Sequence, residues 1–122
     1  MKSLVLSGNA KTKNPLNMKF ITPKELKKLL DSNEILQIVD TRDFEKYETC
    51  HIEKAVSIPQ IELPGRLNEI KKDGKVVIYC IYGMKSDQVY IYLKDKLKIQ
   101  DLSILEGGIY QYAVDIDPTM QV

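Results

Sequence analysis

The chain has 122 residues, a formal net charge of +1 and two cysteines. A chain of this length forms one domain with its own hydrophobic core, so it needs no disulfide framework, and we expect both cysteines to be reduced thiols. The small net charge provides no long-range field to attract nucleic acid or an anionic membrane. No segment approaches the roughly 20 apolar residues of a membrane span, and none near the N-terminus matches a signal-peptide core. We therefore expect a cytoplasmic protein with no nucleic-acid or membrane partner.

The N-terminal segment differs in composition from the rest. Residues 1–19 are rich in Ser, Gly, Asn, Lys and Pro, which predicts a flexible lead or linker. We expect the folded domain to span residues 20–122 and to begin with a short strand at residues 20–21. Thr-Pro-Lys-Glu at residues 22–25 predicts a helix start, because threonine can cap the helix, proline suits its first turn and glutamate completes a capping box.

Short apolar segments alternate with amphipathic segments along the rest of the chain. Further strands are expected at residues 35–39, 55–58, 76–79 and 102–105. Helices are expected at residues 43–48, 61–71, 86–97 and 109–114. Strands that alternate with helices over short connections are typical of an α/β domain. We therefore predict three layers, with a central, mostly parallel five-stranded sheet and helices on both of its faces.

Cys80 is the strongest candidate for a reactive side chain. It follows Val76–Tyr79, whose apolar residues do not alternate with polar ones, as in a strand buried on both faces. Ser86 then precedes apolar residues four apart, so we expect it to cap a helix. A thiol between a strand end and a helix start meets backbone N–H groups and the positive end of the helix dipole, which favour a thiolate. We predict a nucleophile, the alternative being a small buried hydrophobe.

The other candidate residues give weaker signals. One histidine and two cysteines are too few for a metal centre, and Gly107-Gly108 lacks the spacing of a nucleotide-binding fingerprint, so we predict no metal or cofactor and only a turn into a helix. His51 can serve as a general base for Cys80, but we favour a local structural hydrogen bond. Asp40 and Arg42 have no catalytic partner, and we predict that they support the Cys80 loop.

Three ordered motifs resemble the signature of the rhodanese-like domain family. Asp-Thr-Arg at residues 40–42 leads through Tyr, His-Ile and Ala to Ser-Ile-Pro at residues 57–59. Cys-Ile-Tyr-Gly-Met-Lys-Ser at residues 80–86 is similar to the family's active loop, Cys-x-x-Gly-x-Arg-Ser. Leu-Glu-Gly-Gly-Ile at residues 105–109 matches the third motif. The resemblance covers residues 20–114, and the following tail resembles rhodanese domains fused behind adenylyltransferases that activate molybdopterin synthase and related sulfur carriers.

The resemblance implies a sulfurtransferase of the thiosulfate sulfurtransferase type. The thiolate of Cys80 would take the outer sulfur of a donor, either thiosulfate or a protein persulfide such as that of a cysteine desulfurase. An acceptor would then remove the sulfur from the Cys80 persulfide: a thiol, cyanide or a ubiquitin-like sulfur-carrier protein. The pathway, whether molybdopterin, thiamin or tRNA thiolation, stays open. The persulfide anion would be bound by the loop residues Ile81, Tyr82, Gly83, Met84, Lys85 and Ser86.

Two positions depart from the family pattern. Lys85 replaces the usual arginine, and an ammonium lacks the planar fork that binds an oxyanion at two points. We therefore expect weak binding of thiosulfate and a protein persulfide as the natural donor. Cys50 replaces the glycine before His-Ile; it could form a disulfide with Cys80, but we favour an incidental thiol.

Two other classes of protein compete with this interpretation. Cysteine phosphatases and arsenate reductases need an arginine six residues after the cysteine, where this chain has Ser86. Non-catalytic rhodanese-like binding modules typically replace the cysteine. The presence of Cys80 and Gly83 argues against such a module, whereas Lys85 leaves it open.

Overall fold

The computed structural model describes residues 17–122, and the predicted flexible lead lies mostly outside the described residues. The strands are β1 (Phe20–Ile21), β2 (Leu36–Asp40), β3 (Ala55–Ser57), β4 (Lys75–Tyr79) and β5 (Asp101–Leu105). The α-helices are α1 (Pro23–Asp31), α2 (Phe44–Thr49), α3 (Ser86–Leu97) and α4 (Gly108–Asp115). Two 3-10 helices, η2 (Gln60–Gly65) and η3 (Leu67–Glu69), lie between β3 and β4.

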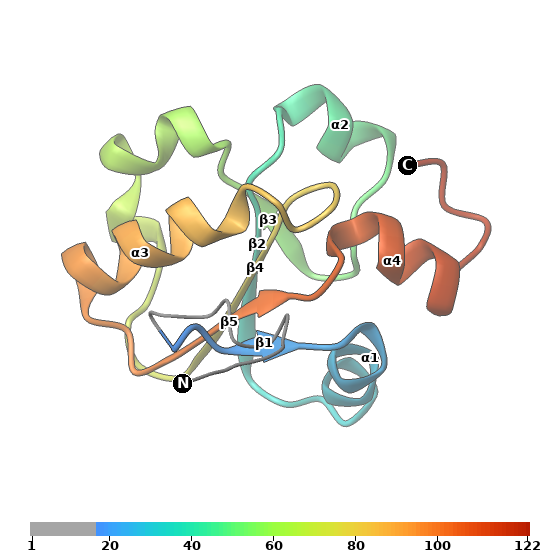
Figure 1. Ribbon diagram of the computed structural model, residues 1–122, viewed down its shortest axis with the longest axis horizontal. Coiled ribbons are helices and arrows are strands. Elements are labelled where there is room, and N and C mark those ends of the chain that lie inside the picture. Colours follow the sequence, from blue (N-terminus) through green and yellow to red (C-terminus); the bar gives the residue numbers. More distant parts are fainter. Residues whose placement is uncertain (1–16) are drawn as a thin grey trace, which may run out of the picture.

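The five strands form one sheet in the order β1-β5-β4-β2-β3, and all of their pairings are parallel (Figure 1). β4 is central, and its residues Val76–Tyr79 are fully buried, as their sequence predicts for a strand covered on both faces. Because the strands run in the same direction, Asp40, Tyr79 and Leu105 end neighbouring strands at one edge of the sheet. Functional loops of parallel sheets lie at this edge.

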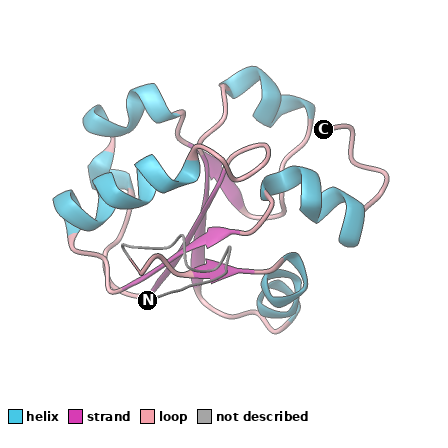
Figure 2. Cartoon of the chain, in the orientation of Figure 1, coloured by secondary structure: helices cyan, strands magenta, loops and turns pink. Residues whose placement is uncertain are grey.

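Helices cover both faces of the sheet, which confirms the predicted three layers (Figure 2). On one face, Val89 and Leu93 of α3 pack with Leu63 of η2 against the sheet. On the other face, α1 and α4 pack against the sheet through Leu26 and Ile109. The two core clusters thus pack on opposite faces of the sheet from which the loops at the strand ends begin.

The start of α1 follows its sequence signal. The Glu25 N–H donates to the Thr22 hydroxyl at 3.1 Å, and the Thr22 N–H donates to a Glu25 carboxylate oxygen at 2.9 Å. Pro23 occupies the first turn. This reciprocal pair is the predicted capping box, and it satisfies backbone donors that have no partner within the helix.

Two local predictions were wrong. A single helix over residues 61–71 is replaced by the 3-10 helices η2 and η3, because Pro64 lies inside η2, has no N–H to donate and disfavours a regular helix. Ser86 does not cap α3: Lys85 holds the cap position, without a side-chain hydrogen bond, and Ser86 is the first residue of the helix.

Residues just before β1 already contact the domain. Met18 packs against a core cluster, and Lys19 forms an ion pair with Asp101 at 2.6 Å. The Lys19 carbonyl also accepts a hydrogen bond from the Ile104 N–H of β5. Within residues 17–122, no helix has the length and apolar content needed to cross a membrane.

Candidate active site

Three segments that follow β2, β4 and β5 come together at the carboxyl edge of the sheet. They are Thr41-Arg42, the active loop (Cys80–Lys85) and Glu106-Gly107. In Figure 1 the active loop projects beyond the sheet, close to the first turn of α4. The structure thus brings the three motifs of the sequence to one place.

Cys80 lies at the base of the active loop, with its thiol next to a backbone donor. The residue is 6% exposed, and the Gly83 N–H donates to its Sγ at 3.0 Å. Gly83 has a φ of 86°, a conformation that residues with a Cβ rarely adopt, and this turn directs its N–H back toward the sulfur. Cys80 lines a pocket of about 920 Å³, so a substrate can reach it from solvent. A thiolate at this position would accept a hydrogen bond as soon as it forms.

The other predicted loop residues divide into two groups. Four of them line the same pocket: Ile81, Tyr82, Met84 and Lys85. Among the described residues, no carboxylate pairs with Lys85, so its ammonium can meet an anion in the pocket. Ser86 is fully buried, and its hydroxyl has no hydrogen-bond partner within the described part of the chain. Ser86 does not line the pocket, so the structure does not place its hydroxyl against a bound anion.

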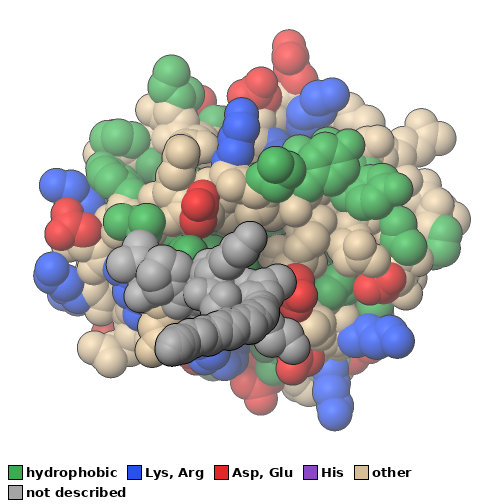
Figure 3. All heavy atoms as spheres, viewed as in Figure 1, with side chains coloured by type: hydrophobic (Ala, Val, Ile, Leu, Met, Phe, Trp, Pro, Cys, Tyr) green, Lys and Arg blue, Asp and Glu red, His purple; other side chains and the backbone are tan. Residues whose placement is uncertain are grey.

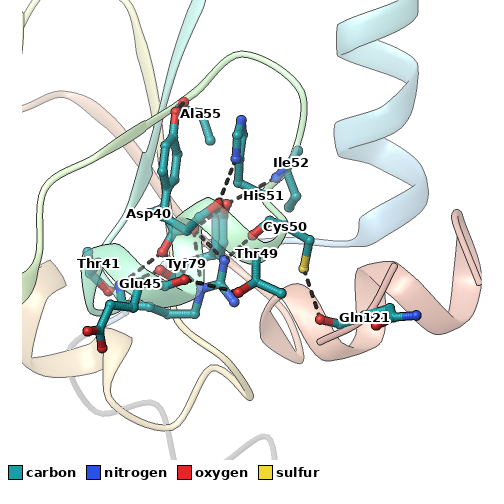
Figure 4. A network of polar contacts seen from close by, with 12 residues as sticks. Asp40, Thr41, Glu45, Thr49, Cys50, His51, Ile52, Ala55, Tyr79 and Gln121 are labelled. Carbon is teal, nitrogen blue, oxygen red and sulfur yellow. Dashed lines mark hydrogen bonds and ion pairs between the residues drawn. The ribbon is translucent and has the colours of Figure 1, made fainter. Parts of the chain in front are cut away.

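Asp40 and Arg42 form a buried ion pair at the carboxyl edge of the sheet. Figure 4 shows the polar network around Asp40 and Tyr79. The Arg42 side chain donates to both Asp40 carboxylate oxygens, with an Nη2–Oδ2 distance of 2.8 Å. The Tyr79 hydroxyl donates to Asp40 Oδ2 at 2.7 Å and accepts from the Ile52 N–H. Tyr79 is the residue before Cys80, so the network contacts the origin of the active loop, and the support role of Asp40 and Arg42 stays a prediction.

Burial and the Asp40 carboxylate both raise the pKa of Tyr79. The folded state therefore holds the Tyr79 proton more tightly than the unfolded state does. The resulting stabilisation is complete below the unfolded-state pKa of about 10 and is lost as the pH rises above that value. The Tyr79→Phe variant lacks this titration. We therefore expect the stability difference between wild type and Tyr79→Phe to shrink above about pH 10. Denaturant unfolding at neutral and alkaline pH measures this stability difference. A difference that stays constant with pH would contradict a raised pKa of Tyr79 in the folded state.

His51 and Cys50 make contacts away from the active loop (Figure 4). His51 Nδ1 donates to the Tyr47 carbonyl at 2.8 Å, and its ring stacks on Tyr47 with a centroid distance of 3.9 Å. The Cys50 thiol donates to the Gln121 carbonyl at 3.4 Å, and both cysteines are free. The contact of His51 agrees with the local hydrogen bond predicted for it, whereas the role of Cys50 as an incidental thiol stays a prediction.

The structure adds contacts that the sequence did not indicate. The N–H groups of Ile109 and Tyr110 in the first turn of α4 donate to the carbonyls of Cys80 and Ile81, at 3.0 and 2.9 Å. The sequence predicted only a turn at Gly107-Gly108, yet this turn places α4 directly against the active loop. The available signal was the pair of consecutive glycines, both of which have positive φ.

Comparison with known proteins identifies the family. The family model for the rhodanese-like domain matches residues 22–115, and the chain therefore belongs to the rhodanese-like domain family. It is 34% identical over 102 residues to the probable adenylyltransferase/sulfurtransferase MoeZ of Mycobacterium tuberculosis, covering 82% of this chain and 26% of MoeZ. It is 34% identical over 80 residues to the putative sulfur carrier protein YrkF of Bacillus subtilis, covering 66% of this chain and 43% of YrkF. The chain thus spans less than half the length of these relatives.

A solved structure supports the same assignment. The crystal structure of a rhodanese-like domain protein from Staphylococcus aureus superposes with a TM-score of 0.73 at 32% identity. The superposition covers 86% of this chain and 98% of that protein. The predicted α/β fold with a parallel five-stranded sheet is therefore confirmed, both by the strand pairing and by this likeness.

Proposed function

We propose that this protein is a sulfurtransferase that carries one sulfane sulfur as a persulfide on Cys80. The observation that carries the proposal is the Gly83 N–H directed at a thiol that opens into a pocket. A backbone donor aimed at an atom that gains negative charge is the arrangement of an oxyanion hole. The names of MoeZ and YrkF, which refer to sulfur transfer and sulfur carriage, support the same chemistry.

The reaction consists of two displacements at sulfur. The Cys80 thiolate attacks the outer sulfur of a donor R–S–S⁻; the donor S–S bond breaks, R–S⁻ leaves, and Cys80–S–S⁻ forms. An acceptor thiolate or cyanide then attacks the outer sulfur, which it keeps, and the Cys80 thiolate is restored. With these two acceptors no external oxidant or reductant is needed. The covalent intermediate implies ping-pong kinetics.

The groups around Cys80 suit a persulfide anion. The Gly83 N–H contacts the inner sulfur, and the Lys85 ammonium lines the pocket where the outer sulfur would lie. Arg42 also lines the pocket, but its guanidinium is occupied by Asp40. The binding groups that the geometry supports are therefore one backbone amide and one ammonium, without a fork for a tetrahedral dianion.

The rim of the pocket favours a donor or acceptor carried by a protein. Ile61 and Met84 line the pocket and are 89% and 78% exposed. Figure 3 also shows hydrophobic side chains in a band on this face of the molecule. Tyr82 of the active loop and Tyr110 of α4, whose rings are in contact, are about half exposed. Exposed apolar side chains that gather around a site are typical of protein–protein contacts. A cysteine desulfurase as donor and a ubiquitin-like sulfur carrier as acceptor fit this surface.

Thiosulfate should be a weak donor because Lys85 offers one charged point. We expect Lys85→Arg to lower the KM for thiosulfate about tenfold, since a guanidinium binds two oxygens at once. Lys27→Arg, on α1 and paired with Asp31, is the matched control and should leave the KM unchanged. Steady-state assays with cyanide as acceptor measure both. A wild-type KM equal to that of Lys85→Arg would contradict the proposed role of position 85.

Separating the two displacements tests the proposed function. The protein is incubated with a donor, freed of it by gel filtration, and mixed with cyanide. We expect about one equivalent of thiocyanate per protein, because the sulfur remains on the enzyme between the two steps. If thiosulfate, glutathione persulfide and a loaded cysteine desulfurase all fail to give thiocyanate, the protein is a non-catalytic rhodanese-like binding module instead.

A further inference from the structure

Three glycines form the contact between the active loop and α4. Gly83 of the loop and Gly107 and Gly108 at the start of α4 have φ values of 86°, 76° and 65°. A Cβ on Gly108 would lie 2.4 Å from the Ile81 carbonyl oxygen and 2.6 Å from that of Cys80. A Cβ on Gly83 would lie 3.3 Å from the Gly107 nitrogen. The loop and the helix therefore meet backbone to backbone, at a distance that a side chain at Gly108 would prevent.

This close approach allows α4 to bind the loop carbonyls. The first N–H groups of a helix have no partner within it, and here those of Ile109 and Tyr110 donate to the carbonyls of Cys80 and Ile81. In a trans peptide, the C=O and the N–H point in opposite directions. Carbonyls held toward α4 thus direct the N–H groups of the following residues, Ile81 and Tyr82, away from it.

We propose that the Gly107-Gly108 turn is a positioning element of the persulfide site. It holds the Cys80 and Ile81 carbonyls on α4, so that these partial negative charges stay turned away from the sulfur and the loop keeps the shape that directs the Gly83 N–H at Sγ. If the loop separated from α4, its peptides could rotate, and a thiolate or persulfide would lose its donors and face carbonyl oxygens. The inference rests on the proposed function of Cys80, but its test uses the free thiol.

The chain offers a matched control for a substitution at Gly108. Gly74, in the turn before β4, also has a positive φ, of 96°, but a Cβ there would meet nothing within 4 Å. Gly74→Ala therefore introduces backbone strain without pushing apart two segments. It lies at the opposite end of β4 from Cys80. If Gly108→Ala changes the reactivity of Cys80 and Gly74→Ala does not, the change comes from the contact between the loop and α4 and not from backbone strain in general.

The experiment measures alkylation of Cys80 by iodoacetamide in a Cys50→Ser background. The thiolate is the species that reacts, so a loss of its hydrogen-bond donor should appear in the pH profile of the rate. At about pH 6 we expect Gly108→Ala to react about tenfold more slowly than the parent and Gly74→Ala to react as fast as the parent, and at about pH 10 we expect the rates of all three proteins to agree within about twofold. Equal rates at the lower pH, or an equal loss at both pH values, would overturn the proposal.

A second pair of variants decides the matter if Gly108→Ala does not fold. The Tyr82 ring of the loop contacts the Tyr110 ring of α4, with centroids 5.4 Å apart. Tyr110→Ala removes this contact on an exposed surface and should slow alkylation about threefold at about pH 6, whereas Tyr110→Phe should react like the parent. An unchanged rate for Tyr110→Ala would then overturn the proposal. Failure of wild-type sulfur loading would overturn the proposed function alone, because alkylation needs no sulfur donor.

Discussion

Replacement of Arg42 by methionine is expected to lower the free energy of unfolding by about 3–5 kcal/mol. Asp40 is fully buried, and Arg42 is its only cationic partner among the described residues. Without the guanidinium, the carboxylate keeps hydrogen bonds from the Tyr79 hydroxyl and from the backbone N–H of residue 42 but has no opposite charge. A buried charge that loses its partner is strongly destabilising, because the desolvation cost remains while the attraction is gone. The folded protein should therefore be markedly less stable.

Arg66 provides the matched control, because it also pairs with two carboxylates but at the surface. Its partners are Glu62 and Glu69, and all three side chains are partly exposed. Exposed ion pairs contribute little, so Arg66→Met should change the stability far less. The double variant Asp40→Asn/Arg42→Met, which removes both buried charges, should recover part of the loss. Denaturant unfolding measures all three, and equal losses in Arg42→Met and Arg66→Met would contradict the importance of the buried pair.

Replacement of Cys80 by serine is expected to abolish sulfur transfer. A serine hydroxyl has the shape of the thiol but is a weak nucleophile without a general base. His51, the only histidine in the chain, has its Nδ1 and ring face occupied by Tyr47. Because the mechanism depends on one covalent carrier, we expect the turnover of Cys80→Ser with cyanide to be lower than that of the wild type by at least about a thousandfold.

Cys50→Ser is the control for this loss. The Cys50 thiol contacts the Gln121 carbonyl and packs beside the core cluster that contains Ile52. It does not line the pocket of Cys80. We expect Cys50→Ser to keep its turnover within about twofold of the wild type, the range of a conservative surface change. Turnover retained by Cys80→Ser, or lost in Cys50→Ser, would show that the carrier is another residue.

The features that the sequence predicted correctly depend on local patterns. The unbroken apolar run at Val76–Tyr79 indicated a strand buried on both faces, and it forms the centre of the sheet. The capping box at the start of α1 consists of residues three apart, so it can be recognised without any tertiary contact. The placement of Cys80 at a strand end follows from the same patterns.

The features that the sequence missed depend on contacts between distant segments. Tyr79 was predicted only as part of a strand, yet its hydroxyl joins Asp40 to the Ile52 N–H across the sheet edge. Gly108 was predicted only as part of a turn, because the carbonyls that it approaches belong to residues 80 and 81. The prediction of one helix over residues 61–71 was wrong because it relied on the spacing of the apolar residues, whereas Pro64 prevents a regular helix there.

The mass of the intact protein after exposure to a sulfur donor tests the central claim most directly. Wild type and Cys50→Ser are incubated with glutathione persulfide or with a loaded cysteine desulfurase and then desalted, and Cys80→Ser is treated in parallel. The mass of each intact protein is measured by mass spectrometry without reducing agent. The account predicts a gain of one sulfur atom in the first two proteins, located by fragmentation on Cys80, and no gain in Cys80→Ser. An added sulfur that persists in Cys80→Ser, or its absence from the wild type with every donor, would contradict it.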